Sequence, residues 1–110
     1  MNYEDMSDFE IKHAVARIVL RARRDCEEIY CNQVTGECRW ADGANWHNFD
    51  PLSNPSDAWP IIVANRINVY ASEGPDFMPW MAGCGGFMVS NKNPLRAAMI
   101  VFLMMQEQAK

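Results

Sequence analysis

The C-terminal segment constrains the fold most, because it predicts a helix that is apolar on nearly every face. Asn93 and Pro94 form a start signal, a side-chain cap followed by proline at the first helical position. The residues that follow, Leu-Arg-Ala-Ala-Met-Ile-Val-Phe-Leu-Met-Met, leave no broad polar face. The apolar run from 97 to 105 has nine residues, whereas a membrane span needs roughly 20. We therefore expect a helix that a sheet covers on one side and another helix, or a second subunit, covers on another.

A second helix is predicted near the N-terminus, over about residues 8–23. Ser7 and Glu10 have the spacing of a capping box, in which each side chain binds the other residue's backbone N–H. Leu20 lies opposite the apolar stripe of this helix, so we expect it to be exposed in a monomer. The stripe recurs at helical spacing and consists of Ile11, Ala14, Val15, Ile18 and Ala22.

Turn signals divide the middle of the chain into short elements around one further helix. In chain order we expect a hairpin over 29–40, a loop over 42–51, a helix that begins at Asn54 or Ser56, a strand over 67–71, a break at 74–76 and a strand or strand pair between 78 and 90. The order α-β-β-α-β-β-α predicts the α+β class, with a small antiparallel sheet and helices packed on its faces. No repeat or linker divides residues 1–110, which we expect to form a single domain.

Four cysteines, Cys26, Cys31, Cys38 and Cys84, lack the paired close spacing of structural zinc sites, so no metal is expected. The N-terminus has no apolar signal-peptide region, which suggests a reducing intracellular compartment and therefore free thiols. The net charge of −4 is opposite in sign to that of a general phosphate-binding protein. Nucleic acid and membrane partners are therefore not expected.

The helix signals and the turns before them carry a resemblance to a known family. Residues 54–62, Asn-Pro-Ser-Asp-Ala-Trp-Pro-Ile-Ile, and residues 93–105 carry it most strongly, with support from 7–11 and from Phe-Asp-Pro at 49–51. The chain resembles the NinX-like proteins of lambdoid phages and prophages over about residues 7–107, and the wider group of phage α-β-α sandwich domains. The resemblance implies a three-layer α-β-α fold and a phage or prophage product that acts in the bacterial host cytoplasm. It carries over no catalytic residues.

Catalytic motifs are missing from the sequence: there is no P-loop, G-x-G-x-x-G, G-x-S-x-G or H-E-x-x-H pattern. The only two histidines are His13 and His47, and we expect His13 to face solvent. His47 could be combined with Asp50 and Cys84 as base, orienting group and nucleophile. Such combinations are frequent by chance among loop residues, so we predict a protein that is not an enzyme and that needs no cofactor.

Aromatic residues and glycines in the connections suggest a binding site instead. Trp46, His47 and Trp80 offer planar rings on which a nucleobase-like ligand could stack. Gly83, Gly85 and Gly86 would let backbone N–H groups approach an anion. The competing interpretation is that large aromatic side chains close the edges of a small core. We favour that interpretation for Trp40 and Trp59, and both interpretations stay open for Trp46 and Trp80; Phe49, Phe77 and Phe87 also lie in or beside connections.

Arg17, Arg21 and Arg24 follow one another at spacings of four and three residues and could hold a phosphate group. Ion pairs with Asp25, Glu27 and Glu28 would explain the same arginines without a ligand, and the negative net charge favours this second explanation. The methionines of the C-terminal helix and an exposed Leu20 suggest a homodimer or higher oligomer.

The sequence therefore predicts a non-enzymatic phage accessory protein that acts by binding. The more specific hypothesis is sequestration of a small nucleotide-like molecule, such as a signal of host defence. The alternative is a protein–protein adaptor or an inhibitor of a host or phage factor.

Overall fold

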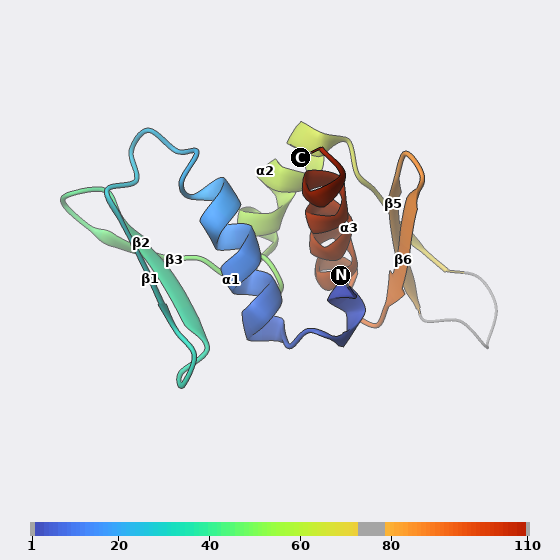
Figure 1. Ribbon diagram of the computed structural model, residues 1–110, viewed down its shortest axis with the longest axis horizontal. Helices are drawn as coiled ribbons and strands as arrows, with labels where there is room; N and C mark the ends of the chain where they lie inside the picture. The colour runs from blue at the N-terminus through green and yellow to red at the C-terminus, as the bar shows by residue number, and fades with distance from the viewer. Residues whose placement is uncertain (1, 73–78, 110) are drawn as a thin grey trace.

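The computed structural model describes residues 2–72 and 79–109 and places the helices between two antiparallel sheets (Figure 1). The helical elements are the 3-10 helix η1 (Tyr3–Asp5), α1 (Asp8–Val19), α2 (Pro55–Asn65) and α3 (Pro94–Gln108). Sheet A consists of β1 (Glu28–Asn32), β2 (Glu37–Ala41) and β3 (Trp46–Asn48), in that order. Sheet B consists of β4 (Asn68–Ala71), β5 (Trp80–Cys84) and β6 (Phe87–Asn91), also in chain order. In this described part of the chain, no helix combines the length and the apolar character needed to cross a membrane.

The α+β class is confirmed, but the strands form two small sheets where one was expected. Helix α3 explains the difference. It is buried continuously from Ala97 to Leu103, and it packs against sheet B as well as against α1 and α2. Sheet A lies on the far side of α1, where β2 contacts that helix (Figure 1). The layers therefore run sheet, helices, sheet, which reverses the expected α-β-α order, because a helix that is apolar all round needs cover on opposite sides.

The start of α1 is confirmed, and its end corrects two expectations. The Ser7 hydroxyl accepts from the Glu10 N–H at 3.1 Å, and the Glu10 carboxylate accepts from the Ser7 N–H at 3.1 Å, which is the predicted capping box. The helix ends at Val19, four residues before the expected limit of 23. Leu20 is 1% exposed and not solvent-facing, because α1 lies between α3 and sheet A and so buries more than one stripe.

Helix α2 begins as predicted but exposes a tryptophan that was expected in the core. The Asn54 side chain caps it by accepting from the Ser56 N–H at 3.0 Å, and Pro55 occupies the first turn. Arg66 ends it in the left-handed conformation, with φ 54°. Trp59 is 63% exposed and Val63, one turn later, is also exposed, since the buried side of α2 is formed by Ala58, Ile61 and Ile62. By contrast, Trp40 is buried as expected.

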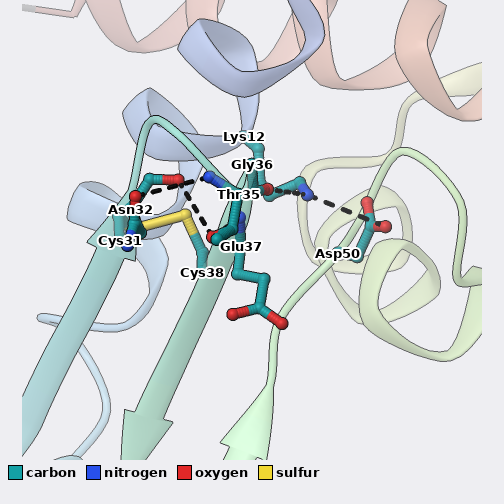
Figure 2. The surroundings of a disulfide bond; sticks show 8 residues. All are labelled: Lys12, Cys31, Asn32, Thr35, Gly36, Glu37, Cys38 and Asp50. Atoms are coloured by element: carbon teal, nitrogen blue, oxygen red, sulfur yellow. Dashed lines mark hydrogen bonds and ion pairs between the residues drawn. A yellow bond between two sulfur atoms is a disulfide. The ribbon is translucent and has the colours of Figure 1, made fainter.

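Sheet A contains two features that the sequence did not predict. The first is β3, which lies within the expected loop 42–51 and pairs with β2. The second is a disulfide between Cys31 and Cys38, where free thiols were expected (Figure 2). The two cysteines are directly opposite each other in the β1–β2 register, with Cα atoms 4.1 Å apart. Hairpin register, which residue spacing alone does not give, brings them together.

Lys12 holds the tip of this hairpin against α1. Its ammonium donates to the Gly36 carbonyl oxygen at 2.7 Å and lies 3.8 Å from an Asp50 carboxylate oxygen, so one half-buried cation joins α1, the β1–β2 turn and the segment before α2 (Figure 2). Gly36 has φ 77°, the left-handed conformation expected for this turn.

Sheet B confirms the expected strands at 67–71 and between 78 and 90. Strands β5 and β6 are joined by a tight turn in which Gly85 has φ 62°. Ala82 and Val89 of these strands are fully buried against the helical layer. The expected break at 74–76, Phe77 and Met78 lie outside the described residues. The starting signal of α3 is confirmed, because the Asn93 side chain accepts from the N–H groups of Leu95 and Arg96 at 2.8 and 3.3 Å.

We expect Lys12→Met to lower the free energy of unfolding by about 1–3 kcal/mol, because it leaves a carbonyl oxygen without its charged donor. The midpoint of urea unfolding, followed by circular dichroism, measures the loss. Lys92→Met is the matched control, since Lys92 is exposed and has no hydrogen bond or ion pair with the described residues. Equal midpoints for the two variants would contradict the role assigned to Lys12.

The disulfide predicts that only two thiols react with an alkylating reagent in unfolded, unreduced protein, and that four react after reduction. Mass spectrometry of the intact chain counts the added groups. Closing a loop of this size stabilises a fold by about 2 kcal/mol, so the replacement of Cys31 and Cys38 together by alanine should lower the unfolding midpoint. The same replacement of Cys26 should have a smaller effect. Four reactive thiols before reduction would exclude the bond.

Candidate ligand-binding cleft

A cleft of about 460 Å³ lies where the end of α1, the inner side of sheet A and the first half of α2 meet. Its volume falls within the range of about 300–1,000 Å³ that is typical of small-molecule sites. The lining residues are Val19, Leu20, Arg23, Trp40, Trp46, His47, Asn48, Phe49, Ser56, Asp57, Pro60 and Ile61.

Stacked rings form one wall of this cleft. Trp40 and His47 are opposite each other in the β2–β3 register, and their ring centroids are 4.4 Å apart with 26° between the planes. The guanidinium carbon of Arg23 lies 4.3 Å from the Trp40 ring centroid. Trp40 is buried, so the core fixes its ring in place, with the Arg23 cation over the ring and His47 stacked on it.

His47 is oriented by an acidic residue in the turn before β3. Its Nε2 is 2.9 Å from one oxygen of Asp42, and the other oxygen accepts from the N–H groups of Ala44 and Asn45 at 2.9 and 2.7 Å. The hydrogen bond from His47, followed by those from the two backbone groups, holds the pKa of Asp42 well below its ordinary value. An ionised carboxylate only accepts, so Nε2 carries the proton in this contact and the imidazole is held in one orientation.

The wall contributed by α2 combines the apolar Pro60 and Ile61 with two polar residues. Ser56 and Asp57 face the cleft, and a carboxylate oxygen of Asp57 accepts from the Asp50 N–H at 2.9 Å. Arg23, which lies over the Trp40 ring, also binds Asp25, to which its Nε and Nη2 donate at 2.8 and 2.9 Å. The cleft thus combines aromatic faces with hydrogen-bonding groups of both kinds and carries one cation and one anion. Such a lining suits a planar ring with polar edges.

The structure distributes the predicted site residues over separate places. Trp46 and His47 line the cleft, whereas Arg17 and Arg21 line a groove along α1, and Arg24 lies exposed beyond the end of that helix. The remaining candidates are in sheet B and its β5–β6 turn: Gly83 and Gly85 at a shallow depression of about 330 Å³, Gly86 exposed beside it, and Trp80 half-buried in β5. They do not meet the aromatic pair because the helical layer separates the two sheets (Figure 1).

Three residues that line the cleft or contact its lining residues were not predicted. Arg23 and Asp42 were overlooked, although both belong to polar segments next to predicted elements. Arg39 was also overlooked: its guanidinium lies 4.9 Å from the Tyr30 ring and 5.6 Å from that of Trp46, and its buried Nε has no hydrogen-bond partner among the described residues. Strand alternation could have placed Arg39 on the side of β2 opposite Trp40.

The catalytic combination of His47, Asp50 and Cys84 is not assembled. His47 pairs with Asp42, Asp50 is next to Lys12, and the Cys84 thiol in sheet B lies 3.5 Å from the Asn65 carbonyl oxygen, to which it donates. Over residues 2–72 and 79–109, no group of three or more histidine, cysteine, aspartate or glutamate side chains is placed to hold a metal ion.

The fold and the cleft define a small α+β protein with an aromatic surface recess and two peripheral sheets. The family described as "Bacteriophage P22, NinX" matches residues 2–106, and the chain belongs to this family of phage proteins. No curated protein and no solved structure matches the chain. The predicted resemblance is therefore confirmed over almost the full length.

The Asp42–His47 contact predicts a specific acid sensitivity. Since the folded-state pKa of Asp42 lies below its unfolded value of about 3.9, its stabilising effect is present above that pH and is lost as the pH falls through the folded-state pKa. Asp42→Asn should therefore flatten the fall in stability from about pH 5 to pH 3. Urea unfolding midpoints across this range measure it. Glu37→Gln, which removes an exposed carboxylate that makes no hydrogen bond or ion pair with the described residues, should leave the slope unchanged.

Proposed function

We propose that this phage protein acts by binding and without catalysis, and that the cleft holds a small planar, nucleotide-like molecule. The observation that carries the proposal is the Arg23, Trp40 and His47 arrangement at the wall of an open recess. Stacking on an aromatic side chain contributes about 1–3 kcal/mol per base in nucleic-acid complexes, independently of which base is bound. Trp46 is half-exposed and borders the recess from β3, and the Arg39 guanidinium lies 5.6 Å from its ring.

The polar groups of the cleft favour a nucleotide with few charges. Asn48, Ser56 and Asp57 offer donors and acceptors to the edge of a ring, and Arg23 offers one cation for a single phosphate or carboxylate. A polyphosphate would bring several negative charges near Asp57. We therefore expect a nucleotide with one or two phosphate charges, and a cyclic nucleotide fits this limit.

In the cytoplasm of an infected bacterium, such a protein would act by keeping its ligand bound, without converting it. By holding a nucleotide-derived defence signal, it would lower the free concentration available to the host receptor. Its membership of a phage family supports this setting.

The second candidate function, a protein–protein adaptor or inhibitor, is supported by exposed apolar side chains. Trp59 and Val63 form a pair on α2, and Tyr70 and Met88 lie on sheet B. A homodimer or higher oligomer would also form through these exposed side chains. Leu20 and α3 no longer support it, because Leu20 is buried and α3 is covered within the described chain.

We expect one or more mono-, di- or cyclic nucleotides to raise the thermal unfolding midpoint, because a ligand of the native state stabilises it. Trp46→Ala should weaken binding about 10-fold, a loss of about 1.4 kcal/mol. Isothermal titration calorimetry measures the change. Trp59→Ala is the matched control, because it removes an exposed tryptophan that lies outside the cleft.

A flat thermal response to the whole nucleotide panel would reject the ligand proposal. Equal weakening by Trp46→Ala and Trp59→Ala would show that binding does not depend on the cleft.

A further inference from the structure

A groove of about 910 Å³ runs along α1, away from the cleft. The hairpin tip borders it at Gln33, and η1 and the end of α3 border it on another side. The residues that line it are Tyr3, Met6, Phe9, Glu10, His13, Ala14, Arg17, Ile18, Arg21, Gln33, Leu103, Gln106, Glu107 and Ala109.

The lining of this groove is mainly apolar. Met6, Phe9 and Ile18 are only partly buried, although they pack against the core, and Leu103 of α3 is buried beneath them. Arg96 holds the end of the groove in place, because its guanidinium donates to the Met6 carbonyl oxygen at 2.7 Å. A helix of twelve residues is about 18 Å long, so α1 offers a surface about three turns in length.

Two arginines on the groove have no partner within the described chain. Arg17 lies in α1 and Arg21 lies two residues beyond its end. Both are exposed, and neither makes a hydrogen bond or ion pair with residues 2–72 or 79–109. The ion pairs expected for them with Asp25, Glu27 and Glu28 are not formed, because Asp25 binds Arg23 instead.

The acidic residues of the groove are already engaged. The Glu10 carboxylate accepts from the Ser7 N–H, and Glu107 forms a hydrogen bond with Tyr3. The groove therefore presents an apolar surface and two available cations, while its carboxylates are occupied by neighbouring groups.

We propose that this groove docks an amphipathic helix of a partner protein, with its apolar face against α1 and α3 and two acidic residues, one turn apart, against Arg17 and Arg21. Helix-in-groove recognition needs an apolar trough of a few turns, and the paired charges fix the register. The proposal is independent of the nucleotide in the cleft and gives the adaptor function a defined surface.

Other occupants fit the groove less well. A nucleic acid would meet a protein with a net charge of −4 and an apolar floor. A flat membrane surface would have to pass between the hairpin tip and the end of α3. A second copy lacks the matching element, because none of the described helices α1, α2 and α3 carries two acidic residues one turn apart.

Selection from a displayed peptide library tests the proposal. The peptides are helix formers of about 14 residues, with an apolar face varied among Leu, Ile, Met and Phe. Two positions four residues apart are varied among Glu, Gln and Lys. We expect the full chain to enrich peptides with glutamate at both positions, and we expect their binding to weaken as salt is added.

Charge-reversal variants identify the surface used. Arg17→Glu and Arg21→Glu should each weaken binding of a selected synthetic peptide by at least about 10-fold in fluorescence anisotropy. Arg24→Glu is the matched control, since Arg24 is exposed and does not line the groove; it should change the affinity less than about twofold. Unfolding midpoints and circular dichroism verify that all three variants fold.

The proposal is overturned if selection on the unchanged protein enriches no peptide more strongly than selection on the Arg17→Glu, Arg21→Glu double variant. It is also overturned if glutamine or lysine, and not glutamate, is enriched at the two varied positions. It is also overturned if only phosphatidylglycerol vesicles retain the protein in an arginine-dependent way, or if the two arginines control only self-association. Nucleotide binding should be unaffected by Arg21→Glu. A failure of the groove proposal can therefore be distinguished from a failure of the cleft proposal.

Discussion

The burial of α3 is the constraint on which the rest of the structure depends. Its buried residues follow one another from Ala97 to Leu103, so the helix has no side that water can cover. Sheet B covers one side and α1 and α2 cover the others. The remaining strands have no access to α3 and pack outside α1, where Cys38 and Trp40 of β2 join the core. The cleft results from this arrangement, since sheet A and α2 both border the end of α1 without closing over it.

Local signals predicted the helices well, because a cap acts within about four residues of sequence. Ser7, Asn54 and Asn93 all make the expected contacts with backbone N–H groups. Burial was harder to predict, since it depends on what packs from elsewhere in the chain. Leu20 is buried by the placement of α1 between two layers, and Trp59 is exposed because α2 turns other residues inward. Periodicity in a single helix shows one apolar stripe and does not reveal a second neighbour.

The candidate site was predicted only in part, for a related reason. Trp46 and His47 could be selected because aromatic residues in a polar connection are unusual, yet their partner Trp40 had been assigned to the core alone. The core position and the binding role are compatible, since one buried ring can expose an edge to a recess. Helical spacing also extended the arginine series to Arg24, but α1 ends at Val19, and Arg23 is the residue that reaches Trp40. The partition of the strands into two sheets then separated the glycines from the rings.

Sheets A and B have no strand in common, and this separation has a consequence for motion. Among the described strands, no backbone ladder couples the aromatic wall to the layer beyond α3. Transient opening of β2 and β3 would part Trp40 from His47 and leave the α3–sheet B unit closed. Amide protons of the two halves are therefore expected to exchange with solvent as two cooperative groups, with the recess in the less protected one.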